Sequence, residues 1–525
     1  MTVVPPEWRV FRRLSLVVAI SLVAVCGSAR DASLDAASLH IRKAAVLNRD
    51  YPASALRDLY LQRELRRAEE WIDSLRKGQA GVPRPGLAEE AYFSEIDQSA
   101  QPFYRYLPKI WFEKNTDEKN EALPLLVYLH GYFSDMDLIN WAIFPTTLTN
   151  LAETVGACVA MPFARSNTDF QGIGEQDVMR VIDEMQRRYG TDPQRVVLLG
   201  LSMGGMGTWT IGARFAECFN GLLIIAGRGD YDFWHKLEPG ALPAWERELI
   251  DAQFLPKLAP RLAGMPILAY HGSADYLIPP AEAGAAFGWV SPVNPAARLV
   301  MLPEGDHWIS DEVLARPDCA EWLSGVLAKG RDNRPAALGI VPGEVPSRIQ
   351  QAFLQPFIFV QPSNATLESE QLFARHCAAW ESFAKARPVT RREAALTESE
   401  LREKNLFVFG SAGESPFARL VLESHAIETD DESWNLQGRK VAREGHGLWI
   451  ALPNPLNRER TVVINDGIYW GERLSPNHRY DMLPDLLVYT AEPGRLGINR
   501  PVCAGKIDRK GLITWWPQPE PVPVK

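Results

Sequence analysis

Between residues 100 and 330 the chain alternates short apolar runs with stretches in which apolar residues recur at helical spacing. This alternation is typical of βαβ units around a mostly parallel sheet. Ligands of such sheets bind beyond the carboxyl ends of the strands, so we expect functional residues in the loops that follow the runs. The predicted strands are 123–130, 157–162, 195–200, 221–227, 266–271 and 297–302, and the predicted helices are 175–189 and 204–215.

The segments on both sides of this unit have patterns of their own. Residues 31–77 place apolar positions at helical spacing, and a Gly- and Pro-rich linker follows at 78–86. After about residue 330 a second α/β pattern begins, and the tail 515–525 is proline-rich and predicted to be extended. The predicted elements of this second α/β pattern are strands 356–360 and 405–409, helices 369–384 and 415–423, and apolar runs 447–452, 461–464 and 486–489. We therefore divide the chain into 1–29, a helical lead-in and linker at 30–99, a first α/β domain at 100–330 and a smaller C-terminal α/β domain at 331–525.

The first 29 residues are predicted to be an export signal. Arg9, Arg12 and Arg13 precede an uncharged apolar run, and small residues follow up to Ala29, after which we expect cleavage. The run is shorter than the about 20 residues that span a bilayer, so we expect no stable transmembrane span and a periplasmic or secreted protein. Two alternatives stay open, a core helix at the N-terminus and lipid anchoring through Cys26.

Composition narrows the function classes only slightly. The 525 residues carry 56 Lys plus Arg and 65 Asp plus Glu, a formal net charge of −9, which argues against a broad nucleic-acid-binding surface. The six cysteines contain no Cys-x-x-Cys pair, so neither a zinc site nor a redox centre is indicated. The sequence predicts neither a disulfide pairing nor an oligomeric state.

The clearest chemical motif is Gly-x-Ser-x-Gly at residues 200–204. It follows a β-branched strand and precedes a predicted helix, which is the setting of a nucleophile elbow. The turn is so tight that the positions two before and two after the serine must be nearly free of side chain, as Gly200 and Gly204 are. We predict that Ser202 is a nucleophile held above the sheet.

A serine hydroxyl is a poor nucleophile until a base takes its proton, so a histidine and an orienting carboxylate should follow. Asp275 and His307 lie in the loops after the next two predicted strands, in the chain order serine, acid, histidine. We predict a Ser202–His307–Asp275 triad. Asp230 is kept as an alternative acid.

Two neighbouring residues and the oxyanion donors complete the predicted site. Asp306 and His271 are expected to shape their loops rather than react. Acyl transfer needs preorganised N–H donors, and the residue after the nucleophile, Met203, should supply one. The second should follow an earlier strand, where Tyr132 comes directly after His130-Gly131. The alternative is that His130-Gly131 only ends that strand.

These motifs resemble those of exported bacterial α/β-hydrolases, the prolyl oligopeptidase-like peptidases and esterases. The resemblance rests on residues 189–209, on His271-Gly-x-x-Asp-x-x-Ile-Pro279 and on Gly305-Asp-His307, and it covers about residues 100–330. It implies an α/β-hydrolase domain that cleaves an ester or peptide bond of a small-molecule substrate through a serine, without metal or organic cofactor.

Two departures from that family leave esters as open as peptides. Prolyl oligopeptidases proper carry a large propeller, and too few residues precede the catalytic domain here to form one. The loop after His130-Gly131 also has aromatic residues where many relatives keep another glycine.

Two further segments leave alternatives. Residues 231–262 are a predicted lid over an apolar acyl group or an excursion packed on the sheet, on the basis of Tyr231, Phe233, Trp234, Trp245 and Phe254. The strand-to-helix turn at 409–415 lacks Gly-x-Gly-x-x-Gly, so we predict no dinucleotide site and a structural or substrate-positioning role for the C-terminal domain. The alternative function for the whole chain is a non-catalytic cell-surface or polysaccharide-binding protein on a hydrolase scaffold.

Overall fold

The computed structural model describes residues 32–77, 84–114, 122–141, 143–330, 346–474, 479–480, 483–494 and 497–517. The predicted export segment lies outside these residues, as does the tail from 518 onward. None of the helices in the described ranges combines the length and hydrophobicity that crossing a bilayer requires.

The first sheet has eight strands within the described residues, in the order β1-β2-β4-β3-β5-β6-β7-β8. β1 and β2 form an antiparallel hairpin, β2 runs antiparallel to β4, and the strands from β4 to β8 are parallel to one another. The strands are β1 Gly86–Ser94, β2 Ser99–Leu107, β3 Leu125–Leu129, β4 Cys158–Pro162, β5 Val196–Leu201, β6 Gly221–Ile225, β7 Ile267–Gly272 and β8 Arg298–Leu302. The six parallel strands lie where the apolar runs predicted them.

The boundary predicted at residue 100 is wrong, because β1 and the start of β2 belong to the sheet. The sequence pattern does not predict β1, because this strand carries two carboxylates at positions where a buried strand would be apolar. Glu89 pairs with Lys43 at 2.5 Å, and Glu90 accepts a 2.9 Å hydrogen bond from Arg105. These ion pairs satisfy two charges in a segment for which the sequence pattern predicts no strand.

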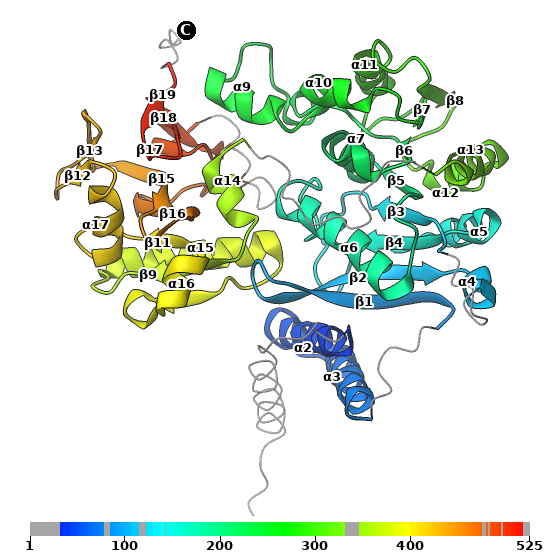
Figure 1. Cartoon of the computed structure of the whole chain (residues 1–525), viewed down its shortest axis with the longest axis horizontal. Coiled ribbons are helices and arrows are strands. Elements are labelled where there is room, and N and C mark those ends of the chain that lie inside the picture. Colours follow the sequence, from blue (N-terminus) through cyan, green and yellow to red (C-terminus); the bar gives the residue numbers. More distant parts are fainter. Residues whose placement is uncertain are drawn as a thin grey trace, which may run out of the picture.

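Helices cover both faces of the first sheet (Figure 1). Alternate residues of each strand point to opposite faces, so Val196 and Leu198 of β5 pack on one side and Val197 and Leu199 on the other. One face is covered by α6 Ile173–Tyr189, α7 Met203–Arg214, α10 Leu255–Leu258 and α11 Pro280–Val290. The other face is covered by α5 Thr146–Val155, α12 Ser310–Leu314 and α13 Pro317–Ala328. Short helices α4 Lys109–Lys114 and η1 Ala216–Cys218 complete the connections.

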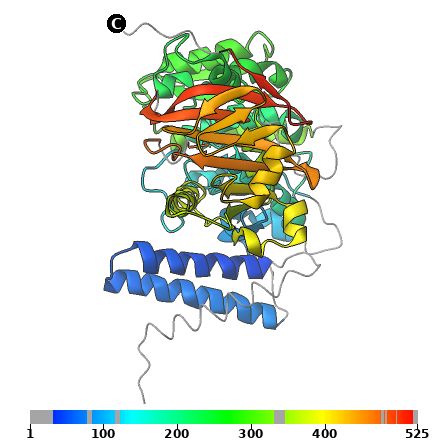
Figure 2. The ribbon, with the colours of Figure 1, turned by 90° about the vertical axis from the view of Figure 1, so that its left-hand side faces the viewer.

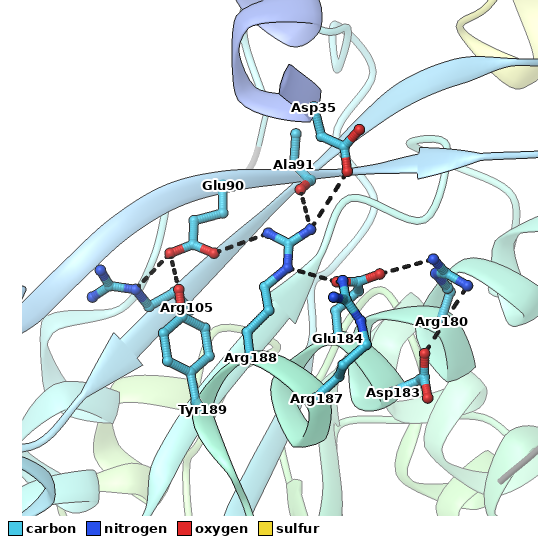
Figure 3. Close-up of polar contacts among 10 residues, drawn as sticks. All are labelled: Asp35, Glu90, Ala91, Arg105, Arg180, Asp183, Glu184, Arg187, Arg188 and Tyr189. Carbon is cyan, nitrogen blue, oxygen red and sulfur yellow. Dashed lines mark hydrogen bonds and ion pairs between the residues drawn. The ribbon is translucent and has the colours of Figure 1, made fainter. Parts of the chain in front are cut away.

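The helical lead-in forms two helices, α2 Ala32–Asp50 and α3 Ala55–Arg76, which lie side by side under the first sheet (Figure 2). Leu39 of α2 belongs to the same apolar cluster as the strands above it. Arg188 of α6 joins the layers electrostatically: its guanidinium lies 3.6 Å from Asp35 of α2, 3.3 Å from Glu90 of β1 and 2.6 Å from Glu184 (Figure 3). The lead-in therefore packs on the body of the protein.

The C-terminal domain is built on a second eight-stranded sheet, in the order β10-β9-β11-β16-β15-β17-β18-β19. Its half from β10 to β16 is parallel, and its half from β16 to β19 is antiparallel. The strands are β9 Phe357–Gln361, β10 Thr390–Arg392, β11 Asn405–Phe409, β15 His446–Asn454, β16 Asn457–Gly467, β17 Leu486–Pro493, β18 Asn499–Ile507 and β19 Ile513–Trp515. The last strand shows that the predicted extended tail begins inside the sheet.

The helices and a small side sheet of this domain flank the large sheet (Figure 1). The helices are α14 Arg348–Phe353, α15 Leu367–Ala384, η3 Glu393–Ala395, α16 Glu398–Glu403 and α17 Pro416–Glu423. The side sheet pairs β12 Ile427–Thr429, β13 Ser433–Leu436 and β14 Arg439–Ala442.

The predicted lid segment joins the two domains. It folds into α8 Asp232–His235, α9 Ala244–Asp251, α10 and η2 Ala259–Leu262. Trp245 and Leu249 of α9 enter an apolar cluster with Phe353 and Trp380 of the C-terminal domain. Three of the five aromatic residues on which the lid prediction rested are buried: Trp245 in that cluster, and Tyr231 and Phe254 in a separate cluster with Met206 and Ile250. This packing favours the packed-excursion interpretation for these three residues.

Candidate active site

The nucleophile elbow forms at the turn from β5 to α7. Ser202 has φ 59° and ψ −116°, a backbone conformation that non-glycine residues rarely adopt. Glycine is required on both sides: a Cβ at Gly200 would lie 2.4 Å from the Gly204 oxygen, and a Cβ at Gly204 would lie 2.0 Å from the Leu129 oxygen. The turn thus holds the serine at the carboxyl end of a central strand, immediately before a helix N-terminus.

Ser202, His307 and Asp275 form a continuous chain of hydrogen bonds. The His307 Nε2 atom lies 2.8 Å from the Ser202 hydroxyl, and its Nδ1 atom lies 2.8 Å from Oδ2 of Asp275. A carboxylate only accepts hydrogen bonds, so Nδ1 carries a proton and the neutral ring leaves Nε2 free to accept from the serine. His307 and Asp275 are both buried. The structure therefore brings together the three residues that the sequence predicted as a triad.

The loop around Asp275 keeps this carboxyl group ionised. Its Oδ1 atom accepts hydrogen bonds from the N–H groups of Leu277 at 2.9 Å and Ile278 at 2.8 Å. Burial alone would raise the pKa of Asp275, but the hydrogen bonds from His307 and the Ile278 N–H lower it below its ordinary value. The His271 ring lies 2.8 Å from the Ile278 oxygen, and burial lowers the pKa of His271, which keeps this ring neutral. His271 thus supports the loop that presents Asp275.

Asp230 and Asp306 have other hydrogen-bond partners. Asp230, the alternative acid, accepts a hydrogen bond from the Phe233 N–H at 3.2 Å. Asp306 accepts one from the Trp308 N–H at 2.8 Å and so caps its own loop. Asp275, and neither of these, is the carboxylate hydrogen-bonded to His307.

The two predicted oxyanion donors both belong to segments that adjoin Ser202. Met203 is the first residue of α7, where N–H groups have no acceptor within the helix and the helix dipole favours negative charge. A Cβ at Gly131 would lie 3.7 Å from the Ser202 Cβ, so the Gly131-Tyr132 segment passes directly beside the serine. The buried His130 ring holds the start of that segment, with Nδ1 2.9 Å from the Gly131 oxygen and Nε2 3.2 Å from the Phe163 oxygen.

Sequence reasoning missed two features of this site. The rings of Phe133 and Trp308, 42% and 50% exposed, stack with centroids 6.5 Å apart, and Trp308 also meets the His307 ring edge-on at 5.2 Å. The loop after β4 has left-handed backbone at five non-glycine positions and touches the Tyr132 segment through Asn167. Its position after a strand end and its cluster of turn-forming residues, Ser166-Asn167-Thr168-Asp169, are the signals that could have drawn attention to it.

Within the described part of the chain, no group of three or more His, Cys, Asp and Glu side chains is arranged to hold a metal ion. The buried thiols of Cys158 and Cys319 lie in the apolar cores, where burial raises the pKa of each to about 12.

Comparisons with known proteins match parts of this chain to peptidases and esterases. Residues 167–327 match the model of the prolyl oligopeptidase family. The chain is 24% identical over 177 residues to a dipeptidyl-peptidase 5 of Porphyromonas endodontalis, covering 31% of this chain and 26% of that protein. It is 39% identical over 90 residues to a bifunctional acetylxylan esterase/xylanase of Neocallimastix patriciarum, covering 16% of this chain and 13% of that protein. This chain therefore spans a minor part of either relative.

Among solved structures, an S-formylglutathione hydrolase from Agrobacterium tumefaciens aligns with a TM-score of 0.37 at 17% identity, over 47% of this chain and 98% of that one. The sheet order, the elbow between β5 and α7 and the positions of the acid and histidine after β7 and β8 are those of an α/β-hydrolase. Residues 167–327, which carry Ser202, Asp275 and His307, match the prolyl oligopeptidase family model and form part of a domain with the α/β-hydrolase fold.

Proposed function

We propose that this protein is a serine hydrolase that cleaves a carboxylic ester or peptide bond of a small-molecule substrate through an acyl-enzyme on Ser202. The observation that carries the proposal is the unbroken hydrogen-bonded chain from the Ser202 hydroxyl through His307 to Asp275, with both links at 2.8 Å. A nucleophile in reach of a base that is itself oriented by a third group is the signature of covalent catalysis.

In the first half-reaction Ser202 Oγ bonds to the acyl carbon while the carbonyl electron pair moves onto oxygen. His307 Nε2 takes the hydroxyl proton, and the ionised Asp275 stabilises the imidazolium that results. The backbone N–H groups of Met203 and Tyr132 bind the oxyanion, each good donor lowering the barrier by about 3–4 kcal/mol. Collapse of this intermediate expels the alcohol or amine, which takes the proton from His307.

In the second half-reaction water adds to the acyl carbon while His307 takes one of its protons. Collapse releases the carboxylic acid and returns the proton to Ser202. The proposed steps use only groups of this chain and water. The exposed ring pair of Phe133 and Trp308 beside His307 favours substrates with an apolar or aromatic group near the scissile bond.

The test is a panel of short acyl esters, feruloyl esters and prolyl or alanyl amides, assayed side by side on the wild-type chain and on Ser202→Ala. We expect turnover of at least one class by the wild type and none above background by the variant. Equal turnover by both proteins would refute the proposed nucleophile. An inert wild type that binds a polysaccharide would favour the non-catalytic alternative.

We also propose that the protein is exported to the periplasm or beyond the cell, because its first 29 residues have the arrangement of a signal peptide. N-terminal sequencing of the protein recovered outside the cytoplasm tests this. A start directly after Ala29 supports cleavage there, and a lipid-modified start at Cys26 supports anchoring. A chain found only in the cytoplasm with its first residues intact refutes export.

A further inference from the structure

We propose that Asn167 is a positioning residue, which holds the segment carrying the Tyr132 N–H in the geometry that binds the oxyanion. The inference rests on the proposed function, since an oxyanion forms only if Ser202 attacks an acyl carbon. Asn167 lies in the loop between β4 and α6, and Tyr132 lies in the loop after β3. Both loops emerge at the carboxyl edge of the parallel strands, next to Ser202.

The Asn167 side chain forms hydrogen bonds with both backbone polar groups of Phe133. Its Nδ2 atom donates to the Phe133 oxygen at 2.7 Å, and its Oδ1 atom accepts from the Phe133 N–H at 3.3 Å. A backbone N–H only donates and a backbone carbonyl only accepts, so this pairing needs one acceptor and one donor on the same planar group. A side-chain amide meets that requirement, whereas a carboxylate or an aliphatic side chain does not.

These two hydrogen bonds hold the residue next to Tyr132, whose N–H is the predicted oxyanion donor. Phe133 follows Tyr132 directly, and Gly131 lies against the Ser202 side chain. The other end of this short segment is fixed by His130, whose ring is 2.9 Å from the Gly131 oxygen. Side chains therefore hold the segment on both sides of Tyr132. Of these two contacts, that of His130 comes from the segment itself and that of Asn167 comes from the loop after β4.

The loop that carries Asn167 is itself held in an unusual conformation. Five of its non-glycine residues have φ between 45° and 76°, namely Ala164, Arg165, Ser166, Asp169 and Phe170. Such backbone costs energy and persists only where the surroundings over-determine it, and it concentrates at functional sites. Asn167 lies within this stretch of unusual backbone, between Ser166 and Asp169.

The surroundings that fix this loop are buried and charged. The Arg165 side chain is fully buried, with Nη1 2.5 Å from Asp97 and Nε 2.7 Å from Asp177. Ser166 Oγ donates to the Met136 oxygen at 3.0 Å, which adds a second link between the two loops. Arg165 also donates to the Ala384 oxygen at 3.2 Å, so the end of α15 in the C-terminal domain contacts the base of the same loop.

If Asn167 positions the Tyr132 N–H, its loss should change the kinetic constants in a specific way. Oxyanion donors act on charge that develops in the transition state, so a displaced Tyr132 N–H should lower kcat far more than it raises KM. Removing a whole oxyanion donor costs about 10²–10³ in kcat, so loosening one should cost about 10- to 100-fold. A purely structural role would instead lower the fraction of active molecules and leave kcat per titrated site unchanged.

The experiment compares Asn167→Ala and Asn167→Asp with the wild type and with Asn150→Ala, a control at an exposed position of α5. Asp keeps the size of Asn and accepts the Phe133 N–H but places a second acceptor against the Phe133 oxygen. Active sites are counted from the burst of p-nitrophenol on mixing with p-nitrophenyl acetate. The kcat and KM per site and the Ki of a trifluoromethyl ketone, which forms an oxyanion on Ser202, are then measured.

We expect both Asn167 variants to lose about 10- to 100-fold in kcat per site, with KM within about threefold and a Ki that rises by the same factor as kcat/KM falls. Asn150→Ala should match the wild type. Unchanged kcat per site and Ki in the variants would overturn the positioning role while leaving the proposed function intact. If the wild type shows neither a burst nor turnover and cannot be distinguished from Ser202→Ala, the proposed function itself is overturned.

Discussion

The Asp275 carboxylate lies 2.8 Å from Nδ1 of His307 and accepts two backbone hydrogen bonds on its other oxygen. That arrangement fixes which nitrogen of the ring carries the proton. Asp275→Asn replaces an acceptor by a group that can donate to Nδ1 of His307. The ring should then adopt the tautomer that carries its proton on Nε2, where it cannot accept the proton of Ser202. We expect kcat to fall by about 10⁴-fold with little change in KM, measured with p-nitrophenyl acetate. Asp306→Asn, which leaves the Asp275 contact in place, should stay within a few-fold of the wild type, and equal losses in both variants would contradict the assignment.

The second prediction concerns the glycine that closes the elbow. A Cβ at Gly204 would lie 2.0 Å from the Leu129 oxygen, so Gly204→Ala must push apart β3 and the start of α7. We expect loss of activity and a melting temperature lower by several degrees. Gly284→Ala on the exposed side of α11 meets nothing within 4 Å and is the matched control, with an expected gain of about 0.5–1 kcal/mol. A fully active Gly204→Ala enzyme would argue against the turn as described.

The third prediction tests the buried charges beneath the Asn167 loop. Arg165→Met removes the cation that faces Asp97 and Asp177 and leaves two carboxylates in the protein interior. Removing one partner of a buried ion pair costs about 3–5 kcal/mol, which urea unfolding would detect as a lower midpoint. The control is Arg76→Met, whose exposed ion pair with Asp73 should change stability by at most about 1 kcal/mol. Similar midpoints for the two variants would show that the buried cluster is not a stabilising feature.

A fourth prediction follows from Glu414 in the C-terminal domain. Its carboxylate accepts hydrogen bonds from the N–H groups of Thr366 and Ser411, both at 2.9 Å. Burial alone would raise the pKa of Glu414, but hydrogen bonds from Ser369, Ser411 and Thr366 lower it to about 2. A depressed carboxyl pKa contributes stability above the ordinary value of 4.5, and this contribution is lost as the pH falls toward about 2.

Glu414→Gln should therefore lower the melting temperature at neutral pH, and the gap to the wild type should narrow as the pH falls from 4.5 toward 2. Thermal melts of both proteins across that range provide the measurement. A gap that stays constant with pH would mean that the charge of Glu414 does not contribute.

The parallel strands and the three residues of the hydrogen-bonded chain could be predicted because each has a local signal. Buried parallel strands are continuous apolar runs, and the elbow requires Gly200 and Gly204 at set positions around Ser202. Asp275 and His307 follow strand ends in a known order. Each of these signals is contained within a few neighbouring residues.

The features that sequence reasoning missed depend on contacts between distant segments. β1 carries Glu89 and Glu90, whose partners come from α2, β2 and α6, so its burial is visible only in three dimensions. The grip of Asn167 on Phe133 depends on a strained loop whose conformation is set by a buried arginine and carboxylates from elsewhere in the chain. The packing of Trp245 against the C-terminal domain is likewise a contact between distant segments.

The role of Ser202 as a nucleophile is tested most directly by its reaction with a fluorophosphonate, followed by intact-mass and peptide mass spectrometry. We expect fast labelling of the wild type with one phosphonyl group per chain, located on Ser202, and no labelling of Ser202→Ala or of the wild type after prior acylation by a slow ester. Labelling of Ser202→Ala at the wild-type rate, or a wild type that stays unmodified, would contradict it.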